Sequence, residues 1–313
     1  MNNLESSIST DALRISKTYL QPIDRILIIG ATGWFGRTAT ALAQLIGTQV
    51  LLVASTTREF HIGRNSFVAY AWNERQIRDF HPTIVIDAAY ITRDYVADFD
   101  VESYVQKNRE LTNRLLSITD IQSIRKVITF SSGAAEVHRS NFHQNPMGDD
   151  PYGFLKLESE KRIQSELSSR TVDYAIVRAW SVSGALVTKS NGFAFSDLVS
   201  QASNGAITVT AANRVYRRYC LVEEAIAVGL FHNTQSDGIL DTGGPLIEIR
   251  ELAEMIKATL PFNIALAESP VTREVDDKYF SNSENWDLAC DKSGLEPSSI
   301  SEQIVQLFNW LTE

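Results

Sequence analysis

The stretch RILIIGATGWFG, residues 25–36, places a short apolar run directly before three glycines, Gly30, Gly33 and Gly36. Continuous apolar runs of this length, rich in β-branched residues, are typical of buried parallel strands. Residues 37–47 follow with helical composition and end in a glycine. The sequence therefore predicts a strand, a tight glycine turn and a helix, which together form one βα unit of an α/β fold.

Each glycine of this turn has a physical purpose if a dinucleotide lies against it. The first permits the tight turn, the second lets the backbone approach a pyrophosphate, and the third lets the helix pack closely on the strand. The phosphates would then lie at the helix N-terminus, where free N–H groups and the helix dipole favour anions. The residues expected to hold the dinucleotide here are Gly30, Thr32, Gly33, Trp34, Phe35 and Gly36. The alternative is a tight βα turn without a ligand.

The end of the next expected strand, residues 48–56, bears on which dinucleotide binds. NAD-binding proteins usually end this strand with an acid that binds the ribose 2′-hydroxyl. Here Ser55, Thr57 and Arg58 occupy the strand end, and the first acid is Glu59. Hydroxyls and a guanidinium bind a 2′-phosphate that a carboxylate would repel. We therefore expect these three residues to bind NADP(H), with NAD(H) as the alternative and a solvated Arg58 as the plainer interpretation.

Two more apolar runs end in small residues, TIVIDAAY at 83–90 and VITFSSGA at 127–134. Ala88 and Ala89 would leave room for the cofactor to lie across the edge of the sheet. Helical segments such as 101–118 separate the strands, and this alternation predicts a doubly wound parallel sheet of the Rossmann type.

The stretch DDPYGFLKLESE, residues 149–160, contains Tyr152 and Lys156, which a helix would present on one face. A pair at this spacing is common, so each residue could be an ordinary helix residue. A serine pair, Ser131 and Ser132, ends the strand about 20 residues earlier.

The order of these features resembles the short-chain dehydrogenase/reductase superfamily, in particular its extended branch of nucleotide-sugar epimerases, dehydratases and ketoreductases. Three later segments resemble further motifs of that branch: 176–186, 217–226 and 240–256. The resemblance covers about residues 24 to 313. It implies a Rossmann domain and a smaller C-terminal α/β substrate-binding region, preceded by a polar extension at 1–23. The implied boundaries are 24–180 plus 217–245 for the first and 181–216 plus 246–313 for the second.

The resemblance implies that Ser132, Tyr152 and Lys156 are catalytic. A free tyrosine has a pKa near ~10, and the Lys156 ammonium together with the positive nicotinamide would favour the phenolate. Tyr152 would then give or take a proton, and Lys156 would also hold the nicotinamide ribose. Ser132 would hydrogen-bond the substrate oxygen, with Ser131 as the alternative for this role.

The chain departs from the family pattern at several positions. Asn73 stands where an Asp usually meets the adenine, and Ser181 stands where an Asn commonly contacts the substrate's phosphates. His138 replaces a tyrosine after the serine strand. The Thr-Asp-Glu triplet of the sugar dehydratases is absent, since Gly133 follows Ser132, and this disfavours a dehydratase.

Several basic residues are candidates for the substrate side. Arg217 matches the family arginine that grips the nucleotide diphosphate, and Arg214 and Arg218 are close enough in sequence to assist, although the three could be a solvated charge cluster. Arg178 is expected to be structural and to pair with a carboxylate near the sheet edge. Asn108 is expected to order the backbone near the site.

Composition excludes several functional classes. The net charge of −9 over 313 residues disfavours binding to nucleic acid. Two distant cysteines and five scattered histidines show no metal-ligand spacing. No apolar run approaches the ~20 residues that would cross a bilayer, and the first residues lack the apolar segment of a signal peptide. We therefore expect a cytoplasmic protein without a metal, whose first ~20 residues are flexible or loosely docked.

The expected activity is NADPH-dependent reduction of a nucleotide-linked 4-keto sugar. The missing acid after the second strand is similar to 4-ketoreductases such as GDP-fucose synthase and CDP-abequose synthase. The alternatives are an NAD-dependent epimerase, a reductase of a non-sugar carbonyl, and a regulator that binds dinucleotide without chemistry. Such regulators generally lack the Tyr-x-x-x-Lys pair. Many relatives dimerise through two helices, which here would be about 101–118 and 152–168.

Overall fold

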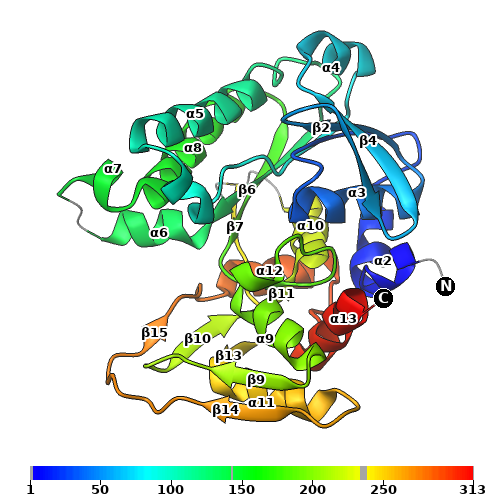
Figure 1. Ribbon diagram of the computed structural model, residues 1–313. Helices are drawn as coiled ribbons and strands as arrows, with labels where there is room; N and C mark the ends of the chain where they lie inside the picture. The colour runs from blue at the N-terminus through cyan, green and yellow to red at the C-terminus, as the bar shows by residue number, and fades with distance from the viewer. Residues whose placement is uncertain (1–2, 142–143, 233–237, 313) are drawn as a thin grey trace.

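The computed structural model describes residues 3–141, 144–232 and 238–312, which form two lobes (Figure 1). Within these residues, the larger lobe contains an eight-stranded sheet in the order β12-β7-β6-β5-β1-β2-β4-β3. Neighbouring strands are parallel except for β3, which is antiparallel to β4. The strands are β1 (Arg25–Ile29), β2 (Gln49–Ala54), β3 (Arg58–Ile62), β4 (Asn65–Ala71), β5 (Ile84–Asp87), β6 (Lys126–Ser132), β7 (Asp173–Ala179) and β12 (Ile239–Asp241). The order steps outward from β1 in both directions, so the predicted Rossmann-type sheet is confirmed.

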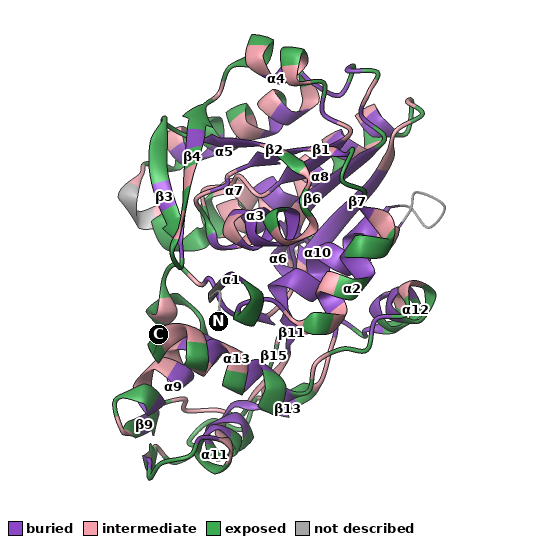
Figure 2. Ribbon diagram, turned by 90° about the vertical axis from the view of Figure 1, so that its right-hand side faces the viewer, coloured by how far each residue is buried: buried purple, intermediate pink, exposed green. Residues whose placement is uncertain are grey.

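Helices cover both faces of this sheet. Ile26 and Ile28 of β1 point to the face covered by α3 (Trp34–Ile46) and α10 (Val222–Phe231). Leu27 and Ile29 point to the opposite face, which is covered by α4 (Glu74–Phe80), α5 (Val101–Leu116) and α8 (Pro151–Leu167). Figure 2 shows the central strands and α10 as buried. Burial on both faces explains why these strands are continuous apolar runs instead of alternating ones.

Two glycines of the first turn are required by geometry. Gly30 has a φ of +80°, and a Cβ there would lie 2.7 Å from the carbonyl carbon of Ala88. A Cβ on Gly36 would lie 2.2 Å from the carbonyl oxygen of Gly30. Any side chain at either position would push the start of α3 away from the ends of β1 and β5.

The smaller lobe has its own apolar core, formed mainly by α9, α11 and α13. Its helices and strands are α9 (Ala194–Ser203), β9 (Ala206–Val209), β10 (Val215–Arg218), β13 (Leu246–Glu248), α11 (Ile249–Thr259), β14 (Ala265–Glu268), β15 (Asp277–Lys278) and α13 (Ile300–Thr312). β10 lies between β13 and β15, and β9 pairs with β14. The segments that build this lobe are separated in sequence by α10 and β12, which belong to the larger lobe.

Short elements connect the lobes or border the space between them. They are η1 (Arg93–Asp98), α6 (Gly133–Ser140), α7 (Pro146–Asp149), β8 (Val182–Ser183), η2 (Ser190–Gly192), β11 (Cys220–Leu221) and α12 (Glu284–Ser293). Among the described residues, no helix is long and apolar enough to cross a membrane. No group of three or more His, Cys, Asp or Glu side chains is placed to hold a metal ion within that part of the chain.

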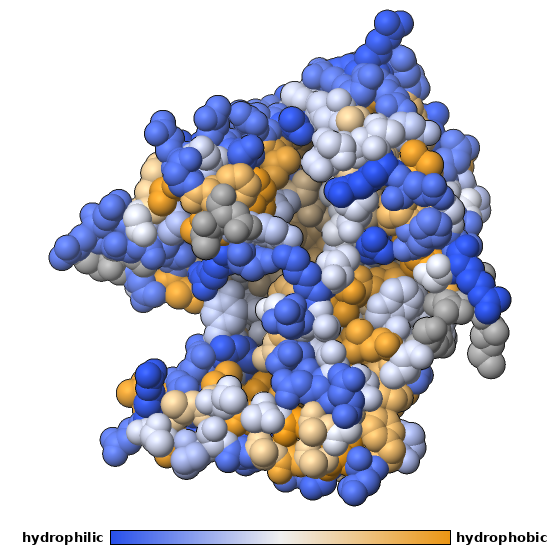
Figure 3. Space-filling model, in the orientation of Figure 1, coloured by the Kyte–Doolittle hydropathy of each residue, from blue (hydrophilic) through white to orange (hydrophobic). Residues whose placement is uncertain are grey.

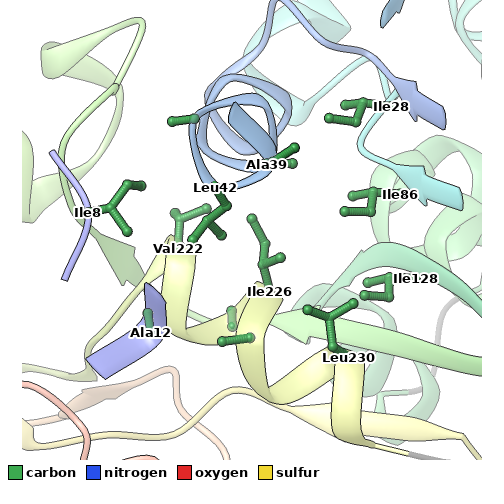
Figure 4. Packing of buried hydrophobic residues seen from close by; sticks show 14 of the residues in the cluster. Ile8, Ala12, Ile28, Ala39, Leu42, Ile86, Ile128, Val222, Ile226 and Leu230 are labelled. Atoms are coloured by element: carbon green, nitrogen blue, oxygen red, sulfur yellow. The ribbon is translucent and has the colours of Figure 1, made fainter. Parts of the chain in front are cut away.

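The N-terminal segment differs from the expectation of a flexible or loosely docked extension. Residues 3–19 form α1 (Asn3–Ser6) and α2 (Thr10–Tyr19), and both helices belong to the fold. Ile8 and Ala12 are buried in the same core as Val222 and Ile226 of α10 (Figure 4). The expectation was wrong because the polar surface of α2 dominates its composition while its apolar residues line one face.

Candidate active site

The three residues predicted to be catalytic converge at the carboxyl end of β6. Ser132 is the last residue of β6 and the N-cap of α6, where its Oγ accepts the N–H of Ala134 at 3.2 Å. Tyr152 and Lys156 lie in the first turns of α8, which begins at Pro151 after the N-cap Asp150. The strand end and the helix start therefore bring a serine, a tyrosine and a lysine together.

The hydroxyl of Tyr152 lies in a polar cluster. It interacts with the Ser132 hydroxyl, and the Ser132 Oγ lies 3.3 Å from the Oη of Tyr279. The Arg93 guanidinium lies over the Tyr152 ring at 5.3 Å from its centroid. Two tyrosine hydroxyls and one serine hydroxyl thus meet at one point, at which a substrate oxygen could be bound.

Burial raises the pKa of Tyr152 to about 12, and the nearby Tyr279 adds to the rise. The Ser132 hydrogen bond and the Arg93 charge lower the pKa by less. A phenol of this pKa is protonated at neutral pH, and in this state Tyr152 is a proton donor. The expected phenolate depends on Lys156 together with the positively charged nicotinamide, so it stays a prediction for the protein with its cofactor.

Lys156 is buried and fixed. Its Nζ donates to the carbonyl oxygen of Phe130 at 2.8 Å and lies 3.4 Å from the centroid of the Tyr90 ring. Burial lowers the pKa of Lys156 to about 7, although the charges of Asp87 and Glu160 act against this. The lysine is therefore held against the sheet and covered by the Tyr90 ring.

A cavity of about 20 Å³, roughly the size of one water molecule, lies beside Lys156. Asp87, Thr129 and Glu160 line it together with Lys156. Burial raises the pKa of Asp87 to about 6, and its carboxylate accepts the N–H of Ala89 at 3.2 Å and the Thr129 hydroxyl at 3.4 Å.

The structure separates the roles of the two serines. Ser131 is buried and its Oγ donates to Oε1 of Glu160 at 2.5 Å, whereas Ser132 faces the tyrosines. Arg178 binds Glu160 through two hydrogen bonds of 2.9 and 2.8 Å and Glu136 through one of 2.8 Å. The structural role predicted for Arg178 is confirmed. Asn108 also has the expected position, since its Oδ1 accepts the N–H of Ile91 at 3.0 Å.

The glycine turn has the form of a phosphate site. Gly33 is the N-cap of α3 and supplies no side-chain hydrogen bond, so the first N–H groups of the helix remain free for a ligand. Ala88 and Ala89 lie next to Gly30. Phe35 packs on Phe130 at 4.6 Å between centroids. The backbone around the turn therefore fits a dinucleotide pyrophosphate.

The side chain of Trp34 points into the protein interior. Its indole is buried and its Nε1 donates to the carbonyl oxygen of Ala185 at 2.8 Å. Only its backbone N–H, in the first turn of α3, faces the predicted phosphate position.

The end of β2 carries positive charge. Arg58 donates through Nη2 to Thr32 Oγ1 at 3.0 Å and lies 3.5 Å from Ser55 Oγ. Arg37 lies close enough for the Arg58 charge to contribute to lowering its pKa, although burial is the larger cause. The carboxylate of Glu59 lies beside His61, with 3.7 Å between His61 Nε2 and Glu59 Oε1.

Two residues predicted to contact the cofactor, Thr57 and Asn73, hydrogen-bond backbone N–H groups of the larger lobe through their side chains. The Thr57 hydroxyl accepts the N–H of Ala71 at 2.9 Å. Asn73 caps α4, where its Oδ1 accepts the N–H of Gln76 at 3.1 Å.

The smaller lobe borders the site on the side of Tyr279. Arg217 binds Asp277 through two hydrogen bonds of 3.1 and 2.9 Å, and its guanidinium lies 5.5 Å from the centroid of the Tyr279 ring. Ser181 follows Trp180, whose ring packs on Tyr279 at 5.0 Å between centroids. Figure 3 shows the molecule hollowed between the α6–α7 region and the β10–β15 region.

Sequence reasoning missed several residues of the site, among them Arg93, which lies over the Tyr152 ring. Tyr279 lies in an irregular segment without a motif, and Tyr90 and Asp87 were read only as part of a strand end. Arg37 could have been found, because it directly follows the third glycine. Trp180 could not, since its ring reaches Tyr279 only through the tertiary fold.

The profile of the NAD dependent epimerase/dehydratase family matches residues 26–239. No curated protein is significantly similar in sequence.

Several solved structures share the fold. UDP-glucose 4-epimerase from Thermotoga maritima, with UDP-glucose, has a TM-score of 0.69 at 17% identity, over 92% of this chain and 98% of that chain. GDP-mannoheptose C4 reductase from Campylobacter jejuni, with NADP bound, has a TM-score of 0.66 at 13% identity, over 94% and 100%. A GDP-L-fucose synthetase from Naegleria fowleri, bound to NADP, has a TM-score of 0.68 at 14% identity, over 94% of each chain.

Proposed function

Because the chain belongs to the NAD dependent epimerase/dehydratase family, we propose that it is an NADPH-dependent reductase of a nucleotide-linked 4-keto sugar. The names of two structural neighbours describe a C4 reductase and a fucose synthetase, both with NADP. Others are epimerases, two of them with NAD. The choice between these activities therefore depends on this chain's own residues.

The observation that carries the proposal is the pair of guanidinium groups at the end of β2. Arg58 and Arg37 lie close together, and Arg58 donates to Thr32 beside the glycine turn. Two like charges at this point favour an anion, and the 2′-phosphate is the group that distinguishes NADPH from NADH. An enzyme that consumes NADPH in each turnover is a reductase.

A protonated Tyr152 also favours reduction, because reduction of a carbonyl needs a proton donor. Bound NADPH would supply a hydride to the substrate carbonyl carbon. Tyr152 would donate its proton to the carbonyl oxygen, and Ser132 would hydrogen-bond that oxygen as negative charge develops on it. The Ser132 hydrogen bond and the Arg93 charge would then stabilise the phenolate that Tyr152 becomes. Lys156 would hold the nicotinamide ribose once the Tyr90 ring gives it access.

We assign the nucleotide-sugar substrate to the hollow between the lobes. Arg217 would bind a diphosphate, which must compete with Asp277 for the guanidinium. Ser181 lies next to Trp180 at the same border and would contact the substrate through its hydroxyl. The proposed cofactor domain comprises 24–180 plus 217–245, and the proposed substrate region 181–216 plus 246–313.

The family resemblance also leads us to propose a homodimer through α5 and α8. The two helices pack side by side, joined by the Arg109–Glu158 ion pair at 2.7 Å. This assembly is a proposal independent of the catalytic one.

The first test is the identity of the bound or preferred dinucleotide. The protein is purified without dialysis and denatured, any released dinucleotide is identified, and the emptied protein is titrated with NADPH and NADH. Preference for NADPH supports the reductase. Tightly retained NAD would instead support an epimerase that recycles its cofactor.

Replacement of the proposed proton donor tests the chemistry. Tyr152→Phe should lower kcat by at least about 10²-fold, the usual contribution of a positioned acid, while the Kd for NADPH stays within about twofold. Reduction of nucleotide-linked 4-keto sugars is measured by loss of NADPH absorbance. A protein that only senses dinucleotide would show no turnover before or after the replacement.

A further inference from the structure

A buried polar cluster joins the N-terminal segment to α13 and α10. Gln306 Nε2 donates to the carbonyl oxygen of Ser7 at 3.3 Å and to Oε1 of Glu223. The same Glu223 oxygen accepts the N–H of Ser9, the N-cap of α2, at 3.2 Å. Glu223 is fully buried. Three elements that are far apart in sequence therefore share one glutamine and one glutamate.

The cluster continues to the start of α3. The Oε1 of Gln306 accepts the N–H of Ala185 at 3.4 Å, and the carbonyl oxygen of Ala185 accepts the Nε1–H of Trp34 at 2.8 Å. Trp34 is the first residue of α3 and follows Gly33, the cap at which the phosphates would bind. Hydrogen bonds thus connect Ser7 with the phosphate-binding end of α3 through the side chains of Gln306 and Trp34 and the backbone of Ala185.

Ala185, in the middle of this connection, lies in an unusual turn. Gly184 has a φ of +124°, and Leu186 has a φ of +65° although it is not a glycine. A left-handed leucine is unfavourable and persists only where its surroundings fix it. Leu186 is buried in the core, and Gln306 holds the N–H of the residue before it. The turn at 184–186 is therefore held in place from both sides.

We propose that Gln306 is a positioning residue for the cofactor: by fixing the turn at 184–186, it holds Trp34 and the phosphate-binding start of α3, and it makes this position depend on the N-terminal segment. The proposal rests on the proposed function in one respect, namely that dinucleotide phosphates bind at the α3 N-terminus. It gives residues 3–20 a role in binding, although none of them reaches the site.

The principal test compares two variants of α13. Gln306→Met keeps the length of the side chain and removes the hydrogen bonds of Gln306 to Ser7, Glu223 and Ala185. The Kd for NADPH should therefore rise about 3- to 10-fold, as loss of one net hydrogen bond allows. Leu307→Ala is the matched control, because Leu307 is buried in the core of the smaller lobe on the same helix. Its melting temperature should fall while its Kd for NADPH stays within about twofold.

Both values of Kd are measured by NADPH fluorescence titration at one temperature below both unfolding transitions, with folding checked by circular dichroism. An unchanged Kd in Gln306→Met would overturn the proposal. So would an equal loss of affinity in Leu307→Ala, because general destabilisation would then explain both.

A second variant, at Trp34, keeps the proposal testable if Gln306→Met fails to fold. Trp34→Phe removes the hydrogen bond to Ala185 together with one ring of the buried indole, and it should also raise the Kd about 3- to 10-fold. If both residues act through one connection, the Kd for NADPH of the double variant should be within about twofold of the higher Kd of the two single variants. Multiplied effects would show independent roles and overturn the proposal. A wild-type protein that binds no dinucleotide would overturn the proposed function as well, which distinguishes the two failures.

Discussion

Arg58 is the residue on which the proposed cofactor preference depends. Replacing it with alanine removes a charge and the hydrogen bond to Thr32 at the end of β2. Arg58→Ala should raise the Kd for NADPH about 10- to 100-fold, the value of a charge-assisted contact, and leave the Kd for NADH within about twofold. Arg75→Ala is the control, since Arg75 is an exposed arginine of α4 that pairs with Asp79 at 3.8 Å. Equal losses for both dinucleotides in Arg58→Ala would contradict a 2′-phosphate site.

The adjacent serines provide a matched pair for the chemistry. Ser132→Ala should lower kcat about 10²- to 10³-fold, because the hydroxyl faces the reacting oxygen in the proposed mechanism. Ser131→Ala removes a buried donor to Glu160 and should lower the free energy of unfolding by about 1–3 kcal/mol, with a smaller effect on kcat. Steady-state kinetics and urea unfolding of both variants separate the roles. The larger loss of kcat in Ser131→Ala would reverse the assignment.

At the residue scale, sequence reasoning found the side chains whose spacing is local. Tyr152 and Lys156 lie on one helix, and Ser132 ends a strand, so their motif is visible in the sequence. Their ionisation was not visible, because burial sets it and burial depends on the whole lobe. Tyr279 was missed for a related reason, since it reaches Ser132 from a distant segment of the chain.

At the element scale, α2 tests whether the N-terminal segment belongs to the core. Ile15 is 1% exposed in that helix. Ile15→Ala should lower the free energy of unfolding by about 2–5 kcal/mol, as removal of a buried isoleucine side chain usually does. Lys17→Ala, on the exposed side of the helix, should change it by less than about 0.5 kcal/mol. Urea unfolding measures both values, and similar small changes would mean that α2 is only loosely attached.

The strands were predictable and the N-terminal helices were not, for one physical reason. A strand buried on both faces is apolar at every position, so β1, β5 and β6 are evident in the sequence. A surface helix is apolar on one face only. In α2 the buried Ala12, Ile15 and Ser16 and the half-buried Tyr19 are spaced by three or four residues, a helical pattern hidden by the polar residues between them.

At the scale of the whole molecule, the N-terminal segment and α13 meet at one junction, formed by Glu223, Gln306 and the turn at 184–186. α2 and α13 lie near each other in Figure 1. Ser9, the N-cap of α2, and Gln306 of α13 both hydrogen-bond Glu223, and Gln306 also accepts the N–H of Ala185 in the turn at 184–186. The two lobes also meet at the site through the Ser132–Tyr279 contact. Because contacts between the two ends of the chain and between the two lobes all lie near the site, the geometry of the site depends on the stability of the complete fold.

Glu223 should make this stability depend on pH. Burial raises the pKa of its carboxyl from an ordinary value of 4.5 to about 7. The groups around it are the neighbouring Glu224 on α10, the Ser9 N–H on α2 and the Gln306 amide on α13. Between these two pKa values the folded protein keeps the proton and the unfolded chain loses it, so the folded state binds more protons. The contribution of Glu223 to stability is therefore complete below the unfolded pKa and is lost as the pH rises through about 7.

The pKa of Asp87 is also raised. The pH dependence of the unfolding free energy of the wild-type protein alone therefore does not identify which group titrates. The Glu223→Gln variant isolates it, because the amide keeps an oxygen for the Ser9 N–H and does not titrate. Urea unfolding of both proteins from about pH 5 to about pH 8 gives the difference in unfolding free energy, wild type minus variant, at each pH. That difference should fall across this range. A constant difference would mean that the Glu223 carboxyl ionises in the folded protein as it does in the unfolded chain, and that the junction is not sensitive to pH.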